Sequence, residues 1–447
     1  MTHFGQLIYS VLFLFIATAC SGKKTILLTG GAGFIGSHTC LELLRTGEYK
    51  VVVIDNLINS SEESLRRVAE LTGGEPIDFH KVDLLDYKAL VQVLLKYQSS
   101  SSSQSEIFGV IHFAGLKAVG ESWEKPLNYY DNNITGTLNL LRAMKECGNI
   151  SRIVFSSSAT VYGDTTQIPV PETCKLAPVS PYASTKAFIE QIIQDVVKQS
   201  PTKMQSVILR YFNPVGADIS GRIGEDPRGI PNNLMPFVAQ VAVGKLPFLS
   251  IFGKDYPTAD GTCIRDYIHV TDLALGHVAA LKRLERDSDL TESPRVLIVN
   301  LGTGSGTSVR EMRDTFASIN NITVPYKFVE RRAGDAARVI AQVDKAKKEL
   351  NWEAKLGLDR MCQDLWRWQS NNPSGFNKAG SNKKQSAANL KPIISHTLRV
   401  AASGILSKTL ITGNLSGELN RGNLWKKWRK GAGRITAASE SNGFKAL

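Results

Sequence analysis

The sequence predicts an α/β protein built on a doubly wound parallel sheet, with a smaller lobe formed by the C-terminal half of the chain. Two observations predict this fold. Short apolar strands alternate with helical segments up to about residue 200, and the chain becomes rich in Pro, Gly and Asn after residue 212. Strands that are apolar throughout are buried on both faces, which is typical of a parallel sheet covered by helices.

The expected elements follow one another in the order that this fold requires. Helices are expected at residues 37–46 and 61–71, from residue 87 onward, and from residue 182 to residue 197. The irregular segment that begins near residue 212 suits a substrate-binding lobe, because loops held by a rigid sheet commonly carry binding residues. The strands are expected at residues 25–29, 50–54, 77–82, 108–113 and 152–155.

The charge of the protein is unevenly distributed. The formal net charge is +12, but residues 371–447 hold 13 Lys and Arg against 2 Asp and Glu, while residues 1–370 hold 40 against 39. The basic character therefore belongs to the tail, residues 371–447, which is expected to be mostly disordered. The nearly neutral remainder gives no reason to expect a nucleic-acid partner.

Residues 1–23 form an N-terminal extension with an apolar run at residues 7–19. This run is shorter than the roughly 20 residues of a membrane span, and no Lys or Arg precedes it. A dispensable extension and a cytoplasmic protein are expected, with targeting to the secretory pathway as the alternative; only this segment could contact a membrane. Six cysteines without metal-ligand spacing predict free thiols and no metal site.

A glycine-rich turn between the first strand and the first helix predicts a dinucleotide site of the Rossmann type. Gly30, Gly33 and Gly36 let the backbone approach a pyrophosphate, whose charge the helix N-terminus then meets. Asp55 follows at the end of the second strand. Its carboxylate can accept hydrogen bonds from the adenosine ribose and would repel a 2′-phosphate, so NAD is favoured over NADP.

Tyr182 and Lys186 form the candidate catalytic pair, with Ser158 as a third member. The spacing of i and i+4 places both side chains on one helical face. A nearby ammonium is expected to lower the pKa of the tyrosine, so that a phenolate can take a proton from a sugar hydroxyl. Ser158 ends a strand, at the edge of the sheet where such folds bind their ligands.

Four longer segments narrow the prediction to one family. They are residues 113–122 (FAGLKAVGES), 155–163 (FSSSATVYG), 209–217 (LRYFNPVGA) and 230–236 (IPNNLMP). With the glycine turn and the Tyr–Lys pair, they resemble the UDP-glucose 4-epimerase family of the extended short-chain dehydrogenase/reductase superfamily. The resemblance runs from about residue 24 to residue 376. It implies a dinucleotide domain at residues 24–211, which includes the Tyr–Lys pair, and a lobe, mainly for the UDP-sugar, at residues 212–370.

The resemblance implies that NAD stays bound through the reaction and is regenerated. Lys186 would hold the nicotinamide ribose, and Phe212 would pack near the cofactor. The cofactor-binding residues that it implies are Gly30, Gly33, Phe34, Ile35, Gly36, Asp55, Asn56, Asn59, Ser60, Asp83, Leu84, Phe113, Ala114, Gly115, Leu116, Lys117, Asn132, Tyr182, Lys186 and Phe212.

The substrate implied by the resemblance is a UDP-hexose, whose C4 hydroxyl is inverted through a 4-keto intermediate. Two arginines suit a diphosphate because the planar guanidinium can bind two phosphate oxygens. Val339, where some members have a bulky tyrosine, would leave room for an N-acetyl group, which predicts turnover of UDP-N-acetylhexosamines as well. The implied substrate-binding residues are Lys117, Ser158, Tyr182, Asn213, Asn233, Leu234, Arg265, Arg332, Asp335 and Val339.

Other functions compete with this prediction. A UDP-xylose/UDP-arabinose 4-epimerase shares the segment at residues 260–267 (DGTCIRDY). A nucleotide-sugar 4,6-dehydratase is disfavoured because Ala159 and Thr160 stand where an acidic pair is needed. A non-catalytic NAD-binding scaffold or sensor is the alternative from another class, although such proteins typically lose the tyrosine or the lysine. Relatives are commonly homodimers, so a homodimer is expected.

Overall fold

The centre of the computed structural model is a seven-stranded sheet in the order β11-β6-β5-β4-β1-β2-β3, in which every neighbouring pair is parallel. The structure describes residues 22–377 except 99–105, 148–149, 201–203, 227–232, 287–294 and 333–334. The strands of this sheet are β1 (Lys24–Thr29), β2 (Tyr49–Asp55), β3 (Asp78–Lys81), β4 (Ile107–His112), β5 (Arg152–Ser158), β6 (Gln205–Tyr211) and β11 (Val296–Leu301).

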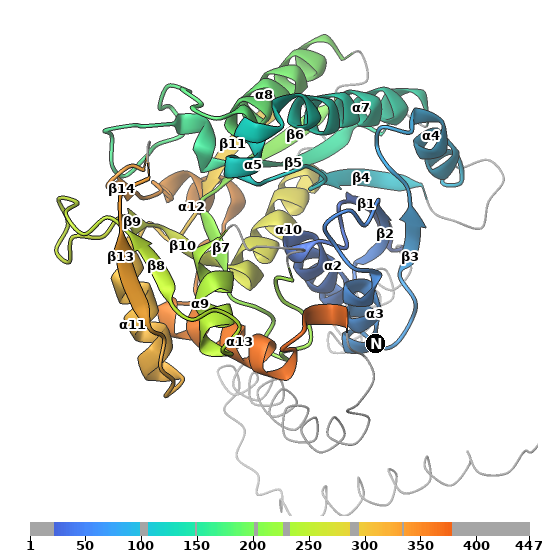
Figure 1. The fold of residues 1–447 in the computed structure, drawn as a ribbon. Coiled ribbons are helices and arrows are strands. Elements are labelled where there is room, and N and C mark those ends of the chain that lie inside the picture. The colour runs from blue at the N-terminus through green and yellow to red at the C-terminus, as the bar shows by residue number, and fades with distance from the viewer. Residues whose placement is uncertain are drawn as a thin grey trace, which may run out of the picture. The chain divides into compact units, whose positions relative to one another are not determined.

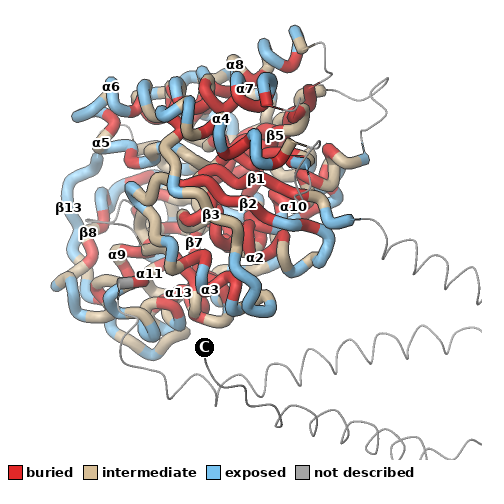
Figure 2. The backbone as a smooth tube through the Cα atoms, turned by 90° about the vertical axis from the view of Figure 1, so that its right-hand side faces the viewer, coloured by how far each residue is buried: buried red, intermediate tan, exposed pale blue. Residues whose placement is uncertain are grey.

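Helices cover both faces of the sheet (Figure 1). Alternate residues of β1 show the two sides, because Ile26 and Leu28 belong to one buried cluster and Leu27 to another. Figure 2 shows these central strands as the most buried part of the chain. On the first face lie α2 (Phe34–Thr46), α3 (Glu62–Leu71) and α10 (Val270–Arg286); on the second lie α4 (Tyr87–Leu95), α7 (Gly136–Glu146) and α8 (Pro181–Gln199).

The remaining elements form the lobe and the connections. Three small sheets pair β7 (Asn213–Val215) with β10 (Tyr267–His269), β8 (Leu249–Phe252) with β13 (Tyr326–Val329), and β9 (Ile264–Arg265) with both β12 (Thr307–Ser308) and β14 (Arg338–Val339). The helices here are α9 (Leu234–Ala242), α11 (Val309–Ile319), α12 (Asp344–Leu350), α13 (Leu358–Asn371) and the 3₁₀ turn η3 (Gly375–Asn377). The connections in the first half are α5 (Val119–Glu124), α6 (Pro126–Tyr129), the π-helical turn η1 (Tyr130–Thr135) and the 3₁₀ turn η2 (Ala159–Tyr162).

The predicted fold class is confirmed, with changes at the ends of elements. The first helix begins at Phe34 rather than at residue 37, because the glycine turn leads directly into it. The chain also returns to the large sheet after residue 212, since β11 pairs with β6. The domain boundaries drawn from the sequence stay a prediction.

Several predictions concern residues that the structure does not describe. The apolar run of the N-terminal extension and residues 378–447 of the basic tail are not among the described residues. Within the described ranges, no helix is long and apolar enough to cross a membrane, and His, Cys, Asp and Glu side chains form no group of three that could hold a metal ion. Five cysteines lie in the described part of the chain, and all five are free.

Candidate active site

The glycine turn forms a cradle at the carboxyl end of β1. Gly30 has a φ of +70°, and a Cβ atom at this position would lie 2.7 Å from the backbone nitrogen of Ala114. A Cβ atom at Gly36 would collide with the carbonyl oxygen of Gly30. Helix α2 begins at Phe34 with Gly33 as its N-cap, and neither a side-chain cap nor an acidic residue occupies the first turn. The turn therefore presents open backbone N–H groups, which suits a pyrophosphate.

Asp55 and the predicted cofactor-binding residues nearest to it lie together after β2 and β3. One carboxylate oxygen of Asp55 accepts from the backbone nitrogen of Ala32 at 3.1 Å, and the other accepts from Leu57 and from the Ser60 hydroxyl, each at 2.8 Å. Asp55 thus ties the glycine turn to the loop that contains Asn59. In the same region Asn56 donates to Asp83, and Leu84 follows Asp83 directly.

The loop after β4, which contains Phe113 to Lys117, is held by a residue that sequence reasoning missed. Asn133 is buried in the π-helical turn η1; its amide oxygen accepts from the backbone nitrogen of Leu116 at 2.8 Å, and its amide nitrogen donates to the Leu116 carbonyl at 3.1 Å. The same amide nitrogen donates to Thr185 on α8 at 3.0 Å. The predicted residue, Asn132, donates to Asn133. A π-helical turn in this position is a signal of function that only the structure reveals.

Tyr182 and Ser158 meet at the carboxyl end of β5. The backbone nitrogen and the hydroxyl of Thr160 donate to Ser158 at 3.2 and 3.0 Å. The side chain of Ser158 also interacts with Tyr182, and this interaction lowers the pKa of the tyrosine. Thr160 is a second residue that sequence reasoning missed.

The sequence predicted a lowered pKa for Tyr182, but the surrounding protein groups leave this pKa raised. Burial raises the pKa of Tyr182, and the hydrogen bond from Ser158 lowers it less than burial raises it. Lys186 instead directs its ammonium to the carbonyl oxygen of Ser156, at 2.7 Å, and over the ring of Phe155. Spacing placed both side chains on one face of α8, as predicted, but it could not reveal how strongly that face is buried.

Lys186 is buried in an environment that disfavours the protonated form of its side chain. Burial lowers the pKa of Lys186 to about 8, while the charge of Glu190, one helical turn further on, raises it. His112 faces the lysine from β4 and is neutral, because burial and the lysine charge lower the pKa of His112 to about 3. The lysine is therefore charged at neutral pH and close to losing its proton above it.

A buried ion pair lies beneath α8, the helix that bears the candidate catalytic pair. Arg210 of β6 donates to both carboxylate oxygens of Glu190, with a shortest distance of 2.6 Å, and Glu190 also accepts from the hydroxyl of Ser157. Both partners are inaccessible to solvent or nearly so. This pair joins α8, β5 and β6 directly behind the serines that end β5, and the sequence motifs did not indicate it.

The predicted diphosphate residues gather in the lobe. Arg265 on β9 and Arg332 in the loop before β14 both bond to the carboxylate of Asp335, at 3.4 and 2.8 Å. The guanidinium of Arg332 also lies 4.7 Å above the ring of Phe252 on β8, an aromatic neighbour that sequence reasoning missed. Two positive charges share one negative charge here, which leaves a net charge suited to an anion.

Glu225 connects the two halves of the site. It accepts from Lys117 at 2.9 Å and from Asn233 at 3.1 Å, so it joins the loop after β4 to the N-cap residue of α9. Leu234 begins this helix, half-buried against the main core cluster. Glu225 is a further residue that the sequence motifs did not single out.

Val339, the residue predicted to lie in the sugar pocket, is close to residues that adjoin the candidate catalytic group. It packs in one apolar cluster with Phe212 and with Ala159 and Ala187, which directly follow Ser158 and Lys186. On its other side Val339 is paired with Arg265 in the β14–β9 sheet. Asn213 follows Phe212 and pairs with β10. Val339 thus links the predicted sugar residues to Arg265 at the predicted nucleotide end.

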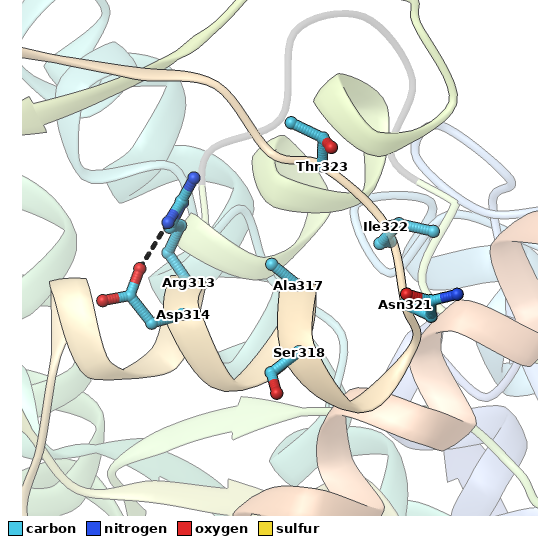
Figure 3. Close-up of a pocket in the computed structure, with 7 residues that line it drawn as sticks. All are labelled: Arg313, Asp314, Ala317, Ser318, Asn321, Ile322 and Thr323. Atoms are coloured by element: carbon cyan, nitrogen blue, oxygen red, sulfur yellow. Dashed lines mark hydrogen bonds and ion pairs between the residues drawn. The ribbon is translucent and has the colours of Figure 1, made fainter.

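Figure 3 shows a hollow at the surface of the protein. Its lining comes from α11 and the loop that follows it, and the guanidinium of Arg313 is paired with Asp314 and with the carbonyl of Val324. None of the predicted site residues lines it.

The strand order, the glycine cradle and the Ser–Tyr–Lys set define the class of the short-chain dehydrogenase/reductases. A family model described as GDP-mannose 4,6 dehydratase matches residues 27–365. The UDP-glucose 4-epimerase of Bacillus subtilis is 54% identical over 354 residues, which cover 79% of this chain and 99% of the relative. The human UDP-glucose 4-epimerase is 52% identical over 360 residues, covering 79% of this chain and 98% of the relative.

Solved structures agree with these relatives. The crystal structure of a UDP-glucose 4-epimerase from Bifidobacterium longum in complex with NAD+ and UDP is 46% identical and has a TM-score of 0.72, with 79% of this chain and 100% of that chain covered. The chain therefore belongs to the UDP-glucose 4-epimerase family, as its motifs predicted.

Proposed function

We propose that this enzyme interconverts UDP-glucose and UDP-galactose by inverting the C4 hydroxyl, through a 4-keto intermediate and with NAD as a retained cofactor. The observation that carries the proposal is the placement of Tyr182 and Lys186 one helical turn apart on α8, with the Lys186 ammonium on the carbonyl of Ser156, at the sheet edge that also bears the glycine cradle. This set holds a proton acceptor beside a dinucleotide site, which is what C4 oxidation requires.

The described residues fit NAD. The cradle at Gly30 and Gly36 has no room for side chains, and the N-terminus of α2 is left open for the pyrophosphate. Asp55 and Asn56 would bind the adenosine ribose, with Asp83 and Leu84 near the adenine. When bound, NAD supplies a hydride acceptor at the nicotinamide, which Lys186 and the loop after β4 would face.

Within this mechanism the protein moves one proton at C4. Ser158 would hydrogen-bond the sugar hydroxyl, and Tyr182 would take the proton as the hydride departs and return it after the sugar has turned. Because burial raises the pKa of Tyr182, the tyrosine needs added positive charge to act as a base near neutral pH. We infer that the ammonium of Lys186, one helical turn from Tyr182 on α8, would provide it.

The nucleotide end of the substrate would be held by Arg265, Arg332 and Asp335, with Asn213, Asn233 and Leu234 at the same side. These contacts would bind the diphosphate tightly and leave the hexose free to turn either face of C4 toward the nicotinamide. Lys117, in the loop after β4, would also bind the substrate.

The test is incubation of the purified full chain with UDP-galactose, UDP-GalNAc or UDP-xylose, without added NAD, followed by chromatography of the products. Conversion of UDP-galactose to UDP-glucose is expected. Turnover of UDP-xylose alone would identify a pentose 4-epimerase. No turnover of any substrate, in protein that becomes absorbing at 340 nm with a reductant and UMP, would identify a non-catalytic NAD-binding protein.

A second activity, turnover of UDP-N-acetylhexosamines, is favoured by Val339. Its side chain is small, half-buried and part of the cluster that contains Phe212. Replacement by tyrosine (Val339→Tyr) would fill the space beside the sugar C2. We expect this variant to lose UDP-GalNAc turnover while keeping UDP-galactose turnover, and a wild-type chain inactive on UDP-GalNAc would contradict the proposal.

A homodimer is proposed on the helices α5, α6 and α8. Trp123, Leu127 and Phe188 are 63%, 74% and 52% exposed, and α8 packs against both shorter helices. Large apolar side chains grouped in this way are typical of an interface. Light scattering is expected to give the mass of a dimer for the wild type and of a monomer for Leu127→Lys.

We also propose a cytoplasmic location for the protein, which cell fractionation would test.

A further inference from the structure

A buried tyrosine and histidine lie on the face of the sheet opposite the catalytic helix. Tyr211 ends β6, and its hydroxyl is hydrogen-bonded to Nε2 of His277 on α10. Both side chains are buried, and their rings lie 5.2 Å apart. α10 covers the first face of the sheet and α8 the second (Figure 1). Neither residue belongs to the site described above.

The direction of each hydrogen bond in this pair follows from the chemistry of the imidazole. Nδ1 of His277 lies 2.8 Å from the carbonyl oxygen of Leu273, and because a carbonyl can only accept, Nδ1 carries the proton. Burial lowers the pKa of His277 to about 4, so the ring is neutral and Nε2 is unprotonated. Nε2 therefore accepts from the hydroxyl of Tyr211.

The chain of hydrogen bonds continues to the catalytic strand. The side chain of Ser156 interacts with Tyr211 and lowers its pKa, while the carbonyl of Ser156 accepts from Lys186 at 2.7 Å. Side chains alternate along β5: Val154 packs with the cluster on the α10 face and Phe155 with the cluster on the α8 face. The Ser156 side chain accordingly turns to Tyr211, while its backbone serves the lysine.

His277 also contacts the loop after β4. Its ring lies 4.8 Å from the ring of Phe113, the first residue of the segment expected to line the nicotinamide. One histidine thus contacts the loop after β4 directly and is linked, through Tyr211, to the end of β5 that holds Lys186.

We propose that His277 is a positioning residue for the reaction. Acting through Tyr211 and Phe113, it fixes the strand end and the loop between which Lys186 and the nicotinamide are aligned. The inference rests on the proposed function and adds to it a residue that contacts neither substrate nor the reacting atoms. It predicts an effect on kcat with little effect on KM, since the arginines that would hold the diphosphate lie elsewhere.

The experiment measures kcat and KM for UDP-galactose in the full-length protein. In His277→Leu, kcat is expected to fall by about tenfold to a hundredfold, because small displacements of catalytic groups cost rate steeply, while KM stays within about twofold. In His277→Gln the amide oxygen can accept from Tyr211, and kcat is expected to recover most of the loss. Tyr211→Phe removes the same hydrogen bond without creating a cavity, and it decides the question if His277→Leu does not fold.

The matched control is Phe316→Leu, a fully buried position on α11 in the same core cluster. It should lower the melting temperature without changing kcat. The inference is overturned if folded His277→Leu and Tyr211→Phe keep the wild-type kcat, if His277→Gln is no better than His277→Leu, or if Phe316→Leu loses kcat equally. A wild-type chain inactive on UDP-galactose would overturn the proposed function and this inference together.

Discussion

At the catalytic end of the site Tyr182 is 9% exposed and Lys186 is 5% exposed, whereas at the nucleotide end the side chain of Arg332 is 57% exposed. The catalytic groups have fixed partners behind them, namely Ser158 for the tyrosine and the Ser156 carbonyl for the lysine. At the nucleotide end, Arg265 and Arg332 share the carboxylate of Asp335 near water.

This difference suits the two tasks that we propose. Charges and dipoles in a buried, preorganised setting act strongly on a reacting centre, and they need no rearrangement during the reaction. An exposed arginine such as Arg332 can exchange its carboxylate partner for a phosphate at small cost, because solvent screens the pair, whereas Arg265 is only 16% exposed. Substitutions at the catalytic end should therefore change rates, and those at the nucleotide end should change apparent affinity.

The largest effect is expected for Tyr182→Phe. Removal of the hydroxyl takes away the only group proposed to accept the proton, so kcat should fall by about a thousandfold, with KM nearly unchanged. Steady-state assays with UDP-galactose measure both constants. The control is Tyr97→Phe, at the end of α4, where the lost hydrogen bonds join Asp78 and His80. Full activity in Tyr182→Phe would rule out the proposed chemistry.

The next effect concerns the buried ion pair beneath α8. Glu190→Gln leaves the Arg210 guanidinium buried without its charged partner, which should lower the free energy of unfolding by about 3–5 kcal/mol. Denaturant unfolding followed by circular dichroism measures the loss. Glu353→Gln, which breaks an exposed pair with Lys347, should leave stability unchanged. Equal losses in the two variants would contradict the distinction between buried and exposed charges.

Local spacing explains which parts of the site could be predicted. The glycine turn and the Tyr–Lys pair depend on residues close in sequence, so their geometry follows from a turn or a helix, and the structure has both on the predicted elements. Asn133 and Glu225 contact partners 17 and 108 residues away, and such contacts become visible only when the chain is folded.

Burial explains the remaining difference. A neighbouring lysine predicted a lowered pKa for Tyr182, but desolvation acts in the other direction and outweighs the other contributions to this pKa. Glu190 stands four residues after Lys186, so its place on the same helical face could have been noticed from spacing. Its arginine partner on β6 could not, because no pattern in the sequence sets the register of β6 against α8.

A third prediction uses pH to test the catalytic end. Burial lowers the pKa of Lys186 to about 8, so raising the pH through 8 removes the ammonium that assists Tyr182. Between pH 7 and pH 9, kcat should therefore decline about tenfold. Lys186→Arg keeps its charge over this range, so its activity, although lower, should show no decline. A wild-type profile that stays flat to pH 10 would mean that the lysine charge does not matter.

The smallest effect is expected at the nucleotide end. Arg332→Gln removes a guanidinium that is already shared with Asp335 and screened by water, so KM for UDP-galactose should rise only about fivefold, with kcat unchanged. The neighbouring Arg331 is similarly exposed but pairs with Asp255 instead, so Arg331→Gln is the matched control and should keep the wild-type KM. Added salt should raise KM in the wild type more than in Arg332→Gln, because the exposed guanidinium is one of the charges that salt screens. If Arg332→Gln lowered kcat as strongly as the catalytic variants do, the nucleotide end would take part in the chemical step, and the two ends would not differ in function as their burial indicates.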